Sequence, residues 1–207
     1  MPSYKLTYFP SRGLAEVSRQ LFVLAGVEFE DEKLDFDQFS KQKPTLPFGQ
    51  VPVLTIDGLT EIPQSVAIAR YLARKFGYAG KTPEEEAWVD ALADQFKDFY
   101  AEIRTYFYSK LGFLPNDIEE ELTKTLIPAR DKYLGVLEKV LKNSKSGFLV
   151  GNDITYADLM IVDNMTTLIG WYPEFTEGFP LVQQHRNRVT NYPKLKEYLE
   201  TRPVTNT

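Results

Sequence analysis

The sequence predicts a protein of the α/β plus all-α class, with a small mixed sheet first and helices alone afterwards. Segments with strand propensity occur only within residues 4–62. The same range also contains segments whose apolar residues recur at helical spacing. Beyond residue 82 the apolar residues recur only at helical spacing. The two patterns meet at residues 77–81, a short segment with glycines that is typical of a linker. The predicted domains are therefore residues 1–79 and 82–207.

The first half of the N-terminal domain is expected to form a βαβ unit. Residues 4–9 are strand-prone and end at Pro10. Residues 14–25 carry apolar side chains every three or four positions until Gly26, so they predict a helix. Residues 28–35 alternate in part between polar and apolar side chains, which predicts the second strand.

The second half of this domain is expected to form a ββα unit after a polar stretch. Residues 37–43 are polar and predict a short helix or a loop. Residues 51–56 and 59–62 predict two strands, and Asp57-Gly58 between them is typical of a hairpin turn. Gln64-Ser65 then opens a helix whose apolar residues form one stripe. The order βαβ-ββα predicts a mixed sheet with helices packed on it.

The C-terminal domain is expected to begin at a strong helix start. Thr82 is a preferred N-cap and Pro83 suits the first helical position. The acidic residues that follow favour the positive end of the helix dipole. Apolar residues at helical spacing then extend from residue 87 to residue 107. Further helices are predicted over about 119–141, from Thr155 onward and over about 192–200.

Composition and charge exclude several functional classes. The chain has 207 residues, of which 43% are hydrophobic and 26% charged, so a disordered chain is excluded. A net charge of −5 argues against a nucleic-acid partner. The chain has no cysteine, which excludes disulfides, thiolate metal sites and a cysteine nucleophile. The single histidine, His185, excludes a multi-histidine metal site, and we expect it on a helix surface without a functional role.

The sequence gives no indication of a membrane segment or an export signal. No run approaches the ~20 apolar residues of a membrane helix. The start, Met1-Pro-Ser-Tyr-Lys, lacks an apolar stretch, so we expect a cytoplasmic protein. Aromatic residues make up 14% of the chain, which suits either an aromatic core or a pocket for an apolar ligand.

Four motifs, in this order, resemble those of cytosolic glutathione transferases. They are Tyr4-Lys-Leu-Thr-Tyr8-Phe9 with Arg12-Gly13-Leu-Ala-Glu16, Leu46-Pro-Phe-Gly-Gln50-Val51-Pro52-Val53-Leu54, Gln64-Ser65 with Ala67-Ile-Ala-Arg-Tyr-Leu72, and Gly151-Asn-Asp-Ile-Thr155-Tyr-Ala-Asp158. The resemblance covers nearly the whole chain and is closest to the sigma-like class, in particular to its nematode members. It implies a thioredoxin-like N-terminal domain, an all-helical C-terminal domain and a homodimer that uses glutathione as co-substrate and holds no bound cofactor.

Tyr8 stands at the end of the first strand, the edge at which open α/β sheets bind their ligands. The resemblance implies that its phenol activates the glutathione thiol by donating a hydrogen bond to the thiolate. The absence of cysteine fits this role, because the reactive sulfur arrives with the substrate. Taken alone, Tyr8 is better explained as a tyrosine packed in a strand, and the other motifs reverse that preference.

The loop before the third strand is implied to hold the peptide part of glutathione. Val51-Pro52 resembles the family's cis-proline step, which turns the Val51 backbone toward the cysteinyl part of the ligand. Gly49 and Gln50 precede it in the same motif, and Gln50 stands where some relatives carry lysine. By itself, Pro52 is better explained as an ordinary trans proline at a strand edge, and the flanking Leu46-Pro-Phe-Gly-Gln50 reverses that preference.

The charged ends of glutathione have separate candidate contacts. Gln64 and Ser65 open a helix whose free N–H groups suit the γ-glutamyl carboxylate, although serine is also a common N-cap. Lys43 is implied to face the glycyl carboxylate and would otherwise be a surface lysine. Phe39 stands where many relatives carry tryptophan, so one indole N–H donor is missing. Asp98 matches the acid that reaches the glutathione amine of the neighbouring subunit, and would otherwise be a helix-surface charge.

Two features depart from the sigma-class prostaglandin synthases. Those enzymes carry an arginine at the position of Leu14, close to the catalytic phenol, so a cation beside the thiolate is missing here unless Arg12 supplies it. Their metal-binding interface uses three acids, and the matching residues here are Asp94, Lys97 and Asp98. Lys97 would oppose a Mg²⁺ site built from carboxylates, so we predict no metal.

An apolar electrophile pocket is expected between the two domains. Phe9 and Leu14 would line it from the first domain, and Tyr100 and Arg104 from the helical domain. Most of the other aromatic residues nearby would instead belong to the core.

The sequence therefore predicts a glutathione transferase that conjugates the thiolate to hydrophobic electrophiles, with peroxidase activity as an additional possibility. A carrier of haem or other hydrophobic ligands on the same fold is an alternative, and so is a scaffold protein like the lens crystallins related to this family. A prostaglandin isomerase is a further alternative, which Leu14 and Lys97 weaken.

Overall fold

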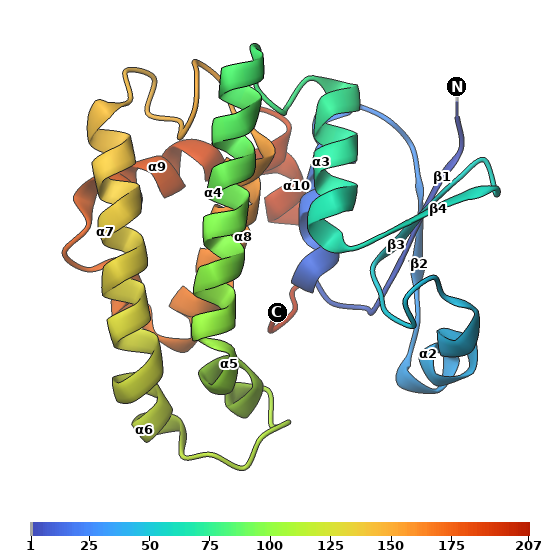
Figure 1. The fold of residues 1–207 in the computed structure, drawn as a ribbon, viewed down its shortest axis with the longest axis horizontal. Helices are drawn as coiled ribbons and strands as arrows, with labels where there is room; N and C mark the ends of the chain where they lie inside the picture. Colours follow the sequence, from blue (N-terminus) through green and yellow to red (C-terminus); the bar gives the residue numbers. More distant parts are fainter. Residues whose placement is uncertain (1) are drawn as a thin grey trace.

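A four-stranded sheet and a group of helices lie side by side in this chain (Figure 1). The structure is a computed structural model and describes residues 2–207. The N-terminal part carries the sheet and its own helices, and the described chain from Pro83 onward contains helices but no strand. The predicted α/β plus all-α class, with its thioredoxin-like βαβ-ββα order, is confirmed.

The sheet has the spatial order β2-β1-β3-β4. Its strands are β1 (Tyr4–Tyr8), β2 (Glu30–Lys33), β3 (Val53–Ile56) and β4 (Thr60–Pro63). β1 runs parallel to β2 and antiparallel to β3, and β3 is antiparallel to β4. The β3–β4 hairpin turns at Asp57 (φ 54°) and Gly58 (φ 66°), which confirms the predicted turn. β3 begins one residue after Pro52, since proline has no N–H to give to a strand ladder.

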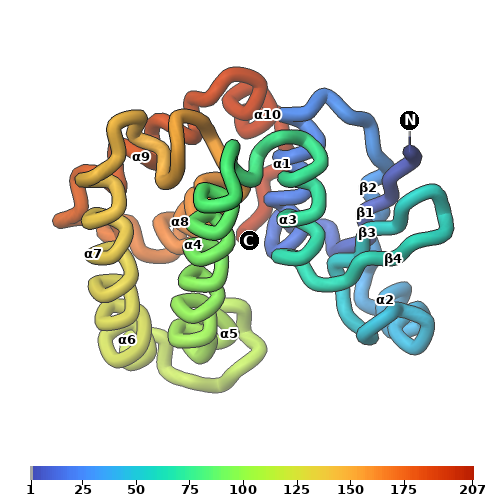
Figure 2. Tube along the Cα trace, turned by 45° about the horizontal axis from the view of Figure 1, so that its top comes forward, coloured from blue at the N-terminus to red at the C-terminus, as the bar shows by residue number. Residues whose placement is uncertain are grey.

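The helices of the N-terminal part are α1 (Glu16–Ala25), α2 (Phe36–Gln42) and α3 (Ser65–Phe76). A 3-10 turn over Gly13–Ala15 precedes α1, so the predicted helix begins with a tighter turn. α1 ends at Gly26 and α3 at Gly77, both with the positive φ that favours glycine after a helix. α1 and α3 lie between the sheet and the helical part (Figure 2).

The helical part begins with a long helix and then folds back on itself (Figure 1). Its helices are α4 (Pro83–Glu102), α5 (Arg104–Lys110), α6 (Ile118–Glu121), α7 (Ile127–Asn143), α8 (Tyr156–Trp171), α9 (Pro180–Thr190) and α10 (Leu195–Thr201). Short π-helical (Leu122–Leu126) and 3-10 (Pro173–Thr176) segments join them. Thr82 caps α4 by accepting a hydrogen bond from the Glu85 N–H at 3.2 Å, as predicted.

Two helical features differ from the sequence prediction. The run expected to continue through Phe107 breaks at Ile103, whose φ of −88° and ψ of 6° turn the chain from α4 into α5. The break is hidden in the sequence because Ile103 and Phe107 are both buried and keep helical spacing. The bounds of α9 were not predicted, because its sequence is mainly polar and only Val182, His185 and Val189 are buried.

His185 contradicts the expectation of a surface position. Its side chain is 2% exposed, and its Nε2 lies 2.7 Å from Oδ1 of Asp158. The Asp158 carboxylate also accepts hydrogen bonds from the N–H groups of Leu149 (2.9 Å) and Thr155 (2.8 Å). His185 therefore ties α9 to the start of α8, and a polar helix sequence does not reveal such a buried pair.

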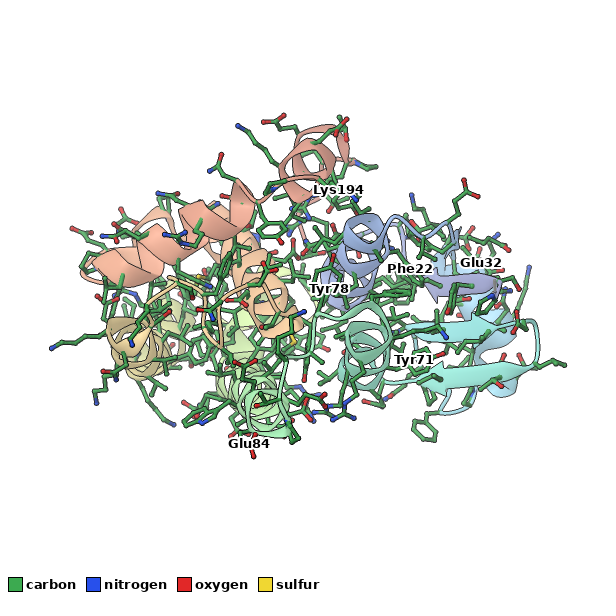
Figure 3. The ribbon with its side chains drawn as sticks, turned by 90° about the horizontal axis from the view of Figure 1, so that it is seen from above. Phe22, Glu32, Tyr71, Tyr78, Glu84 and Lys194 are labelled. Atoms are coloured by element: carbon green, nitrogen blue, oxygen red, sulfur yellow. The ribbon has the colours of Figure 1, made fainter. Side chains whose placement is uncertain are left out.

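One apolar core runs through both parts of the chain, with α8 at its centre. On the sheet side, Phe22 of α1 stacks on Phe29 with 4.4 Å between ring centroids, and Figure 3 shows Phe22 between α1 and the sheet. A second, smaller cluster joins Leu6 and Tyr8 of β1 to Ala15. This cluster presses the end of β1 against the turn that begins α1, and thereby positions Tyr8.

Candidate functional site

Tyr8 closes β1, and its side chain is buried against the turn that follows. Its phenol oxygen accepts a hydrogen bond from the N–H of Leu14 at 3.1 Å. Gly13 makes this close approach possible, because a Cβ there would lie 2.6 Å from the phenol oxygen and its φ of 41° favours glycine. The Leu14 N–H occupies one lone pair of the oxygen, so the phenol hydrogen is free to donate to a ligand.

Burial raises the pKa of Tyr8 above its ordinary value of 10.0. The Leu14 N–H and the positive charge of Arg19 act against this rise without reversing it. At neutral pH the phenol is therefore protonated, and it serves as a hydrogen-bond donor rather than as a phenolate base. A protonated donor is what stabilisation of a bound anion requires.

The turn that carries Leu14 is held by hydrogen bonds to its backbone. The guanidinium of Arg19 donates to the carbonyl oxygen of Ser11 at 2.8 Å. The N–H of Arg12 donates to the carbonyl oxygen of Thr207 at 2.8 Å, so the last residue of the chain also touches this turn. The position of the Leu14 N–H, and with it the phenol of Tyr8, is thus set from both parts of the molecule.

The Arg12 side chain is turned toward the helical part. Its guanidinium pairs with Asp163 at 3.1 Å and donates to the hydroxyl of Thr167 at 2.8 Å, and both partners lie on α8. Arg12 was the candidate to replace the cation that is missing at Leu14. The cation whose charge favours ionisation of the Tyr8 phenol is Arg19 instead.

Arg12 and Arg19 belong to a buried charge network that joins the two parts. Glu16 of α1 accepts hydrogen bonds from Arg19 (3.2 Å) and from Arg202 (2.6 Å). Arg202 also donates to Asp163 at 2.9 Å. Burial and the charge of Glu16 raise the pKa of Asp163, while Arg12 and Arg202 act against that rise. The network therefore balances charges that neither part could bury alone.

The loop before β3 brings the second and third motifs together. The Val51–Pro52 bond is cis, as the resemblance implied. Nε2 of Gln64 donates to Oε1 of Gln50 at 3.2 Å, which joins this loop to the start of α3. Gly49 has a φ of 60° and lies next to Lys43, whose carbonyl oxygen would be 3.5 Å from a Cβ at that position.

Gln64 precedes α3 in a backbone conformation that residues other than glycine seldom adopt, with φ 73° and ψ 115°. Such strained positions are concentrated at functional sites. The side chain of Gln64 is exposed and that of Ser65 is half-buried. Because the first N–H groups of α3 lack carbonyl partners within the helix, this end of the helix suits a carboxylate.

Phe9, Phe39 and Lys43 lie together on the N-terminal side of the site. The ring centroid of Phe9 is 5.4 Å from that of Tyr8, 5.2 Å from Phe39 and 5.3 Å from Phe36. Nζ of Lys43 lies 5.9 Å from the centre of the Phe39 ring, and the lysine is exposed. The aromatic contacts of Phe9 are thus with Tyr8, Phe36 and Phe39 of the N-terminal part.

Tyr100, Arg104 and Tyr108 are the candidates for the helical side of the site. The guanidinium carbon of Arg104 lies 5.6 Å from the centre of the Tyr108 ring, a cation–π arrangement. Burial raises the pKa of Tyr100, the charges of Tyr108 and Tyr8 add to the rise, and Arg104 acts against it. The ring centroid of Phe107 lies 5.0 Å from that of Tyr100 and 6.3 Å from that of Tyr108.

Tyr108 is the residue that sequence reasoning missed. It follows Arg104 by four positions on α5, so the two share a helix face. That spacing was the available signal, and it was hidden because the run appeared to continue α4 without a break.

Asp98 is exposed on α4. Lys97 beside it is also exposed, and Asp94 lies 3.9 Å from Arg70. Within residues 2–207 no group of three or more acidic or histidine side chains could hold a metal ion. None of the helices in this described range is long and apolar enough to cross a membrane.

Comparison with known proteins gives matches along the whole chain. The family model "Glutathione S-transferase, N-terminal domain" matches residues 4–74, and "Glutathione S-transferase, C-terminal domain" matches residues 97–202. Glutathione S-transferase 3 of Caenorhabditis elegans is 50% identical over 206 residues, which cover 99% of each chain.

Solved structures match equally well. Monomeric Na-GST-3, a glutathione S-transferase from Necator americanus, is 47% identical with a TM-score of 0.96, and the match covers 99% of this chain and 100% of that one. A Nu-class GST from Haemonchus contortus is 49% identical with a TM-score of 0.92, and the match covers 100% of both chains.

Proposed function

This chain belongs to the glutathione S-transferase family, and from that premise we propose that it conjugates the glutathione thiolate to hydrophobic electrophiles in detoxification. The observation that supports this proposal most directly is the buried phenol of Tyr8. Its oxygen is occupied by the Leu14 N–H at 3.1 Å and its proton is retained at neutral pH, so it has one hydrogen bond to give.

In the proposed reaction, the glutathione thiol loses its proton to solvent and Tyr8 donates its O–H to the resulting thiolate. The thiolate then attacks the electrophilic carbon and forms the C–S bond. At a haloarene, halide leaves with the electron pair of the broken bond; at an activated alkene, a proton from water completes the addition. Tyr8 returns unchanged, since it donates a hydrogen bond and does not transfer its proton.

Activation of the thiol supplies only part of the rate. A thiol with a pKa of about 8.5 is roughly 3% thiolate at pH 7, and lowering its pKa by ~2 units gives roughly 75% thiolate. This ~25-fold gain is offset by a nucleophilicity that falls roughly 8-fold, which leaves a net gain of about 3-fold. Positioning of the electrophile and stabilisation of its developing charge must supply the rest.

The proposed glutathione site uses the edge of the sheet where Tyr8, the cis-proline loop and the start of α3 meet. The Val51 backbone pairs with the cysteinyl part, with Gly49, Gln50 and Pro52 shaping the loop. The first N–H groups of α3, preceded by Gln64 and Ser65, hold the γ-glutamyl carboxylate. Lys43 faces the glycyl carboxylate beside Phe39, whose ring cannot supply the indole N–H of a tryptophan.

We also propose a homodimer in which Asp98 of one copy reaches the glutathione amine of the other. Asp98 is exposed, and the exposed aromatic residues Phe48 (64%) and Trp88 (61%) offer apolar surface to a second copy. Light scattering decides between a dimer and a monomer such as the Necator americanus relative. If the dimer forms, Asp98→Asn raises the KM for glutathione; an unchanged KM contradicts the role of Asp98.

Further assignments complete the proposal. We propose that the domain boundary lies between residues 79 and 82 and that the protein is cytoplasmic. We also assign the chain to the sigma-like class, although the Haemonchus contortus relative is named Nu-class. Peroxidase activity is a second candidate function, because the same Tyr8-bound thiolate could attack a peroxide oxygen. The carrier alternative stays behind it because a carrier does not need the protonated phenol, and the prostaglandin isomerase alternative is weakened by Leu14 and Lys97.

The experiment that tests the function measures conjugation to 1-chloro-2,4-dinitrobenzene together with glutathione binding. Wild type is expected to turn over, whereas Tyr8→Phe binds glutathione and loses most of the rate. Tyr4→Phe, which removes a phenol oxygen from the other end of β1, is the matched control. Wild type that binds glutathione without turning over this substrate or an organic peroxide would favour the carrier.

A further inference from the structure

We propose that the segment after α10, residues 202–207, is a positioning strap for the reaction. The strap holds the turn before α1 on both sides of Leu14 and thereby fixes the N–H that Tyr8 accepts. The inference rests on the proposed function and deepens it, because it assigns two positioning residues, Arg202 and Thr207, that contact neither glutathione nor the electrophile.

The tip of the strap, Thr207, lies against the start of the turn. The N–H of Arg12 donates to the carbonyl oxygen of Thr207 at 2.8 Å, and the hydroxyl of Thr205 donates to the same oxygen at 2.6 Å. Arg12 is 7% exposed. Removing the Thr207 oxygen therefore leaves a buried N–H without this acceptor, which a folded chain avoids by moving its backbone.

The root of the strap, Arg202, is anchored just beyond the turn. Its guanidinium donates to the Glu16 carboxylate at 2.6 Å and to the Asp163 carboxylate of α8 at 2.9 Å. The Glu16 side chain is 2% exposed and that of Arg202 is 10% exposed, so both are held in a buried ion pair. In sequence, the two anchor points on the first domain, Arg12 and Glu16, lie on opposite sides of Leu14.

The residues between these anchors add little that would hold the strap in place. Pro203, Val204 and Asn206 are exposed, and the segment forms neither helix nor strand. A side chain as open as that of Val204 gains no free energy from burial. The course of the strap, whose end Figure 2 shows between α1 and the helical part, therefore depends on its two anchors.

The strap is expected to affect the thiolate more than the affinity for glutathione. Between its anchors lie Gly13, whose missing Cβ admits the phenol, and Leu14, whose N–H is 3.1 Å from the phenol oxygen. A displaced turn would move that N–H and change the hydrogen bond that Tyr8 gives to the thiolate. The other proposed glutathione contacts, in the loop before β3 and at the start of α3, belong to different segments and would stay in place.

The test removes the tip of the strap by ending the chain after Val204. This truncation deletes only residues 205–207 and keeps the buried anchor Arg202, so the protein should still fold. With 1-chloro-2,4-dinitrobenzene as the substrate, kcat is expected to fall about 3- to 10-fold, the effect of losing one hydrogen bond. The pH at which kcat/KM levels off should rise from near 6.5 toward 8.5, because the thiolate is less stabilised. The KM for glutathione should stay unchanged.

Two matched controls separate positioning from general stability. Thr207→Ala keeps the backbone oxygen that Arg12 contacts and should behave as wild type. His185→Leu weakens a buried pair between α8 and α9 without touching the strap, and should leave the pH profile in place. A truncated protein with the wild-type kcat and pH profile overturns the proposal, and so does an equal displacement of the profile in either control.

Hydrogen–deuterium exchange separates failure of this inference from failure of the proposed function, because it needs no turnover. In the truncated protein the amides of residues 11–16 should exchange faster than in wild type, whereas those of the β3–β4 hairpin, residues 53–63, should not change. If wild type turns over no substrate, the transferase proposal fails, and faster exchange over residues 11–16 still supports the hold of the strap on this turn. Unchanged exchange over residues 11–16 overturns the strap, whatever the activity.

Discussion

The phenol oxygen of Tyr8 accepts a hydrogen bond from the Leu14 N–H at 3.1 Å, which leaves the tyrosine with only its proton to offer. The Leu14 N–H belongs to a turn that two hydrogen bonds hold in place. Arg19 donates one to the Ser11 carbonyl oxygen, and the Arg12 N–H donates the other to the Thr207 carbonyl oxygen. Burial keeps the proton on the phenol by raising its pKa. The orientation and the protonation state of the proposed catalytic group therefore have separate structural causes.

The first prediction concerns pH dependence. Because the Tyr8 pKa is raised above 10.0, the phenol stays protonated from neutral pH up to at least pH 10. In wild type, kcat/KM should rise only until the bound thiol is ionised, near pH 6.5 for a ~2-unit shift, and then stay level. In Tyr8→Phe the rise should continue to about pH 8.5.

The size of the loss in Tyr8→Phe separates two roles. At pH 7, a loss of about 3-fold would mean thiol activation alone. A loss nearer 100-fold would mean that the hydrogen bond also fixes the sulfur or stabilises the transition state. A Tyr8→Phe profile that still levels off near pH 6.5 contradicts the assignment of Tyr8 to the thiolate.

The second prediction concerns Gly13. In Gly13→Ala the new Cβ would lie 2.6 Å from the Tyr8 phenol oxygen, so Tyr8 must move. Gly26→Ala is the control, since Gly26 has a similar positive φ of 64° but open space around a Cβ. Urea denaturation should show a loss of about 1–2 kcal/mol in the free energy of unfolding for both variants. Only Gly13→Ala should lower kcat; equal kcat values would disprove the link between the turn and Tyr8.

The third prediction concerns the strained backbone at Gln64, with φ 73° and ψ 115°. Gln64→Gly relieves the strain, so the free energy of unfolding should not decrease. The KM for glutathione should rise about 10-fold, since the backbone before the α3 N–H groups is no longer fixed and the side chain is lost. Lys194→Gly, at another residue of positive φ (64°), should leave KM unchanged. A Gln64→Gly enzyme with the wild-type KM argues against the carboxylate site.

The fourth prediction concerns the buried pair His185–Asp158. His185→Leu removes the 2.7 Å contact and leaves part of the Asp158 carboxylate without its partner. The free energy of unfolding should fall by about 1–3 kcal/mol, while kcat per folded molecule stays constant. Gln184→Leu, at an exposed neighbouring position of α9, controls for the introduced leucine. If both variants are equally stable, the pair contributes nothing to folding.

Local signals in the sequence were sufficient for most of the fold. The cap at Thr82, the turn at Asp57-Gly58 and the glycine ends of α1 and α3 each depend on residues adjacent in sequence, and all are present in the structure. His185 was placed wrongly because its partner Asp158 is 27 positions away and belongs to another helix. A polar helix such as α9 gives periodicity analysis too few apolar positions to recognise.

The candidate site was predictable to the extent that resemblance marked its motifs. The resemblance marked the motifs that contain Gln50 and Gln64, but not the hydrogen bond between these two side chains. Tyr108 was missed because the helix break at Ile103 leaves the apolar spacing intact. The direction of Arg12 depends on Asp163 and Thr167, more than a hundred positions away, and short-range patterns hold no information on such pairings.

The charge network between the two parts restricts how new substrate ranges can evolve. Arg12, Glu16 and Arg19 come from one half, and Asp163 and Arg202 from the other. A hybrid gene that joined this helical half to a sheet half without matching residues would leave a buried charge without its partner. This would lower the free energy of unfolding by roughly 3–5 kcal/mol. After gene duplication, exposed positions such as Arg104 can vary one at a time without disturbing the charge network. Diversification by point substitution at the pocket is therefore far easier than diversification by exchange of whole halves.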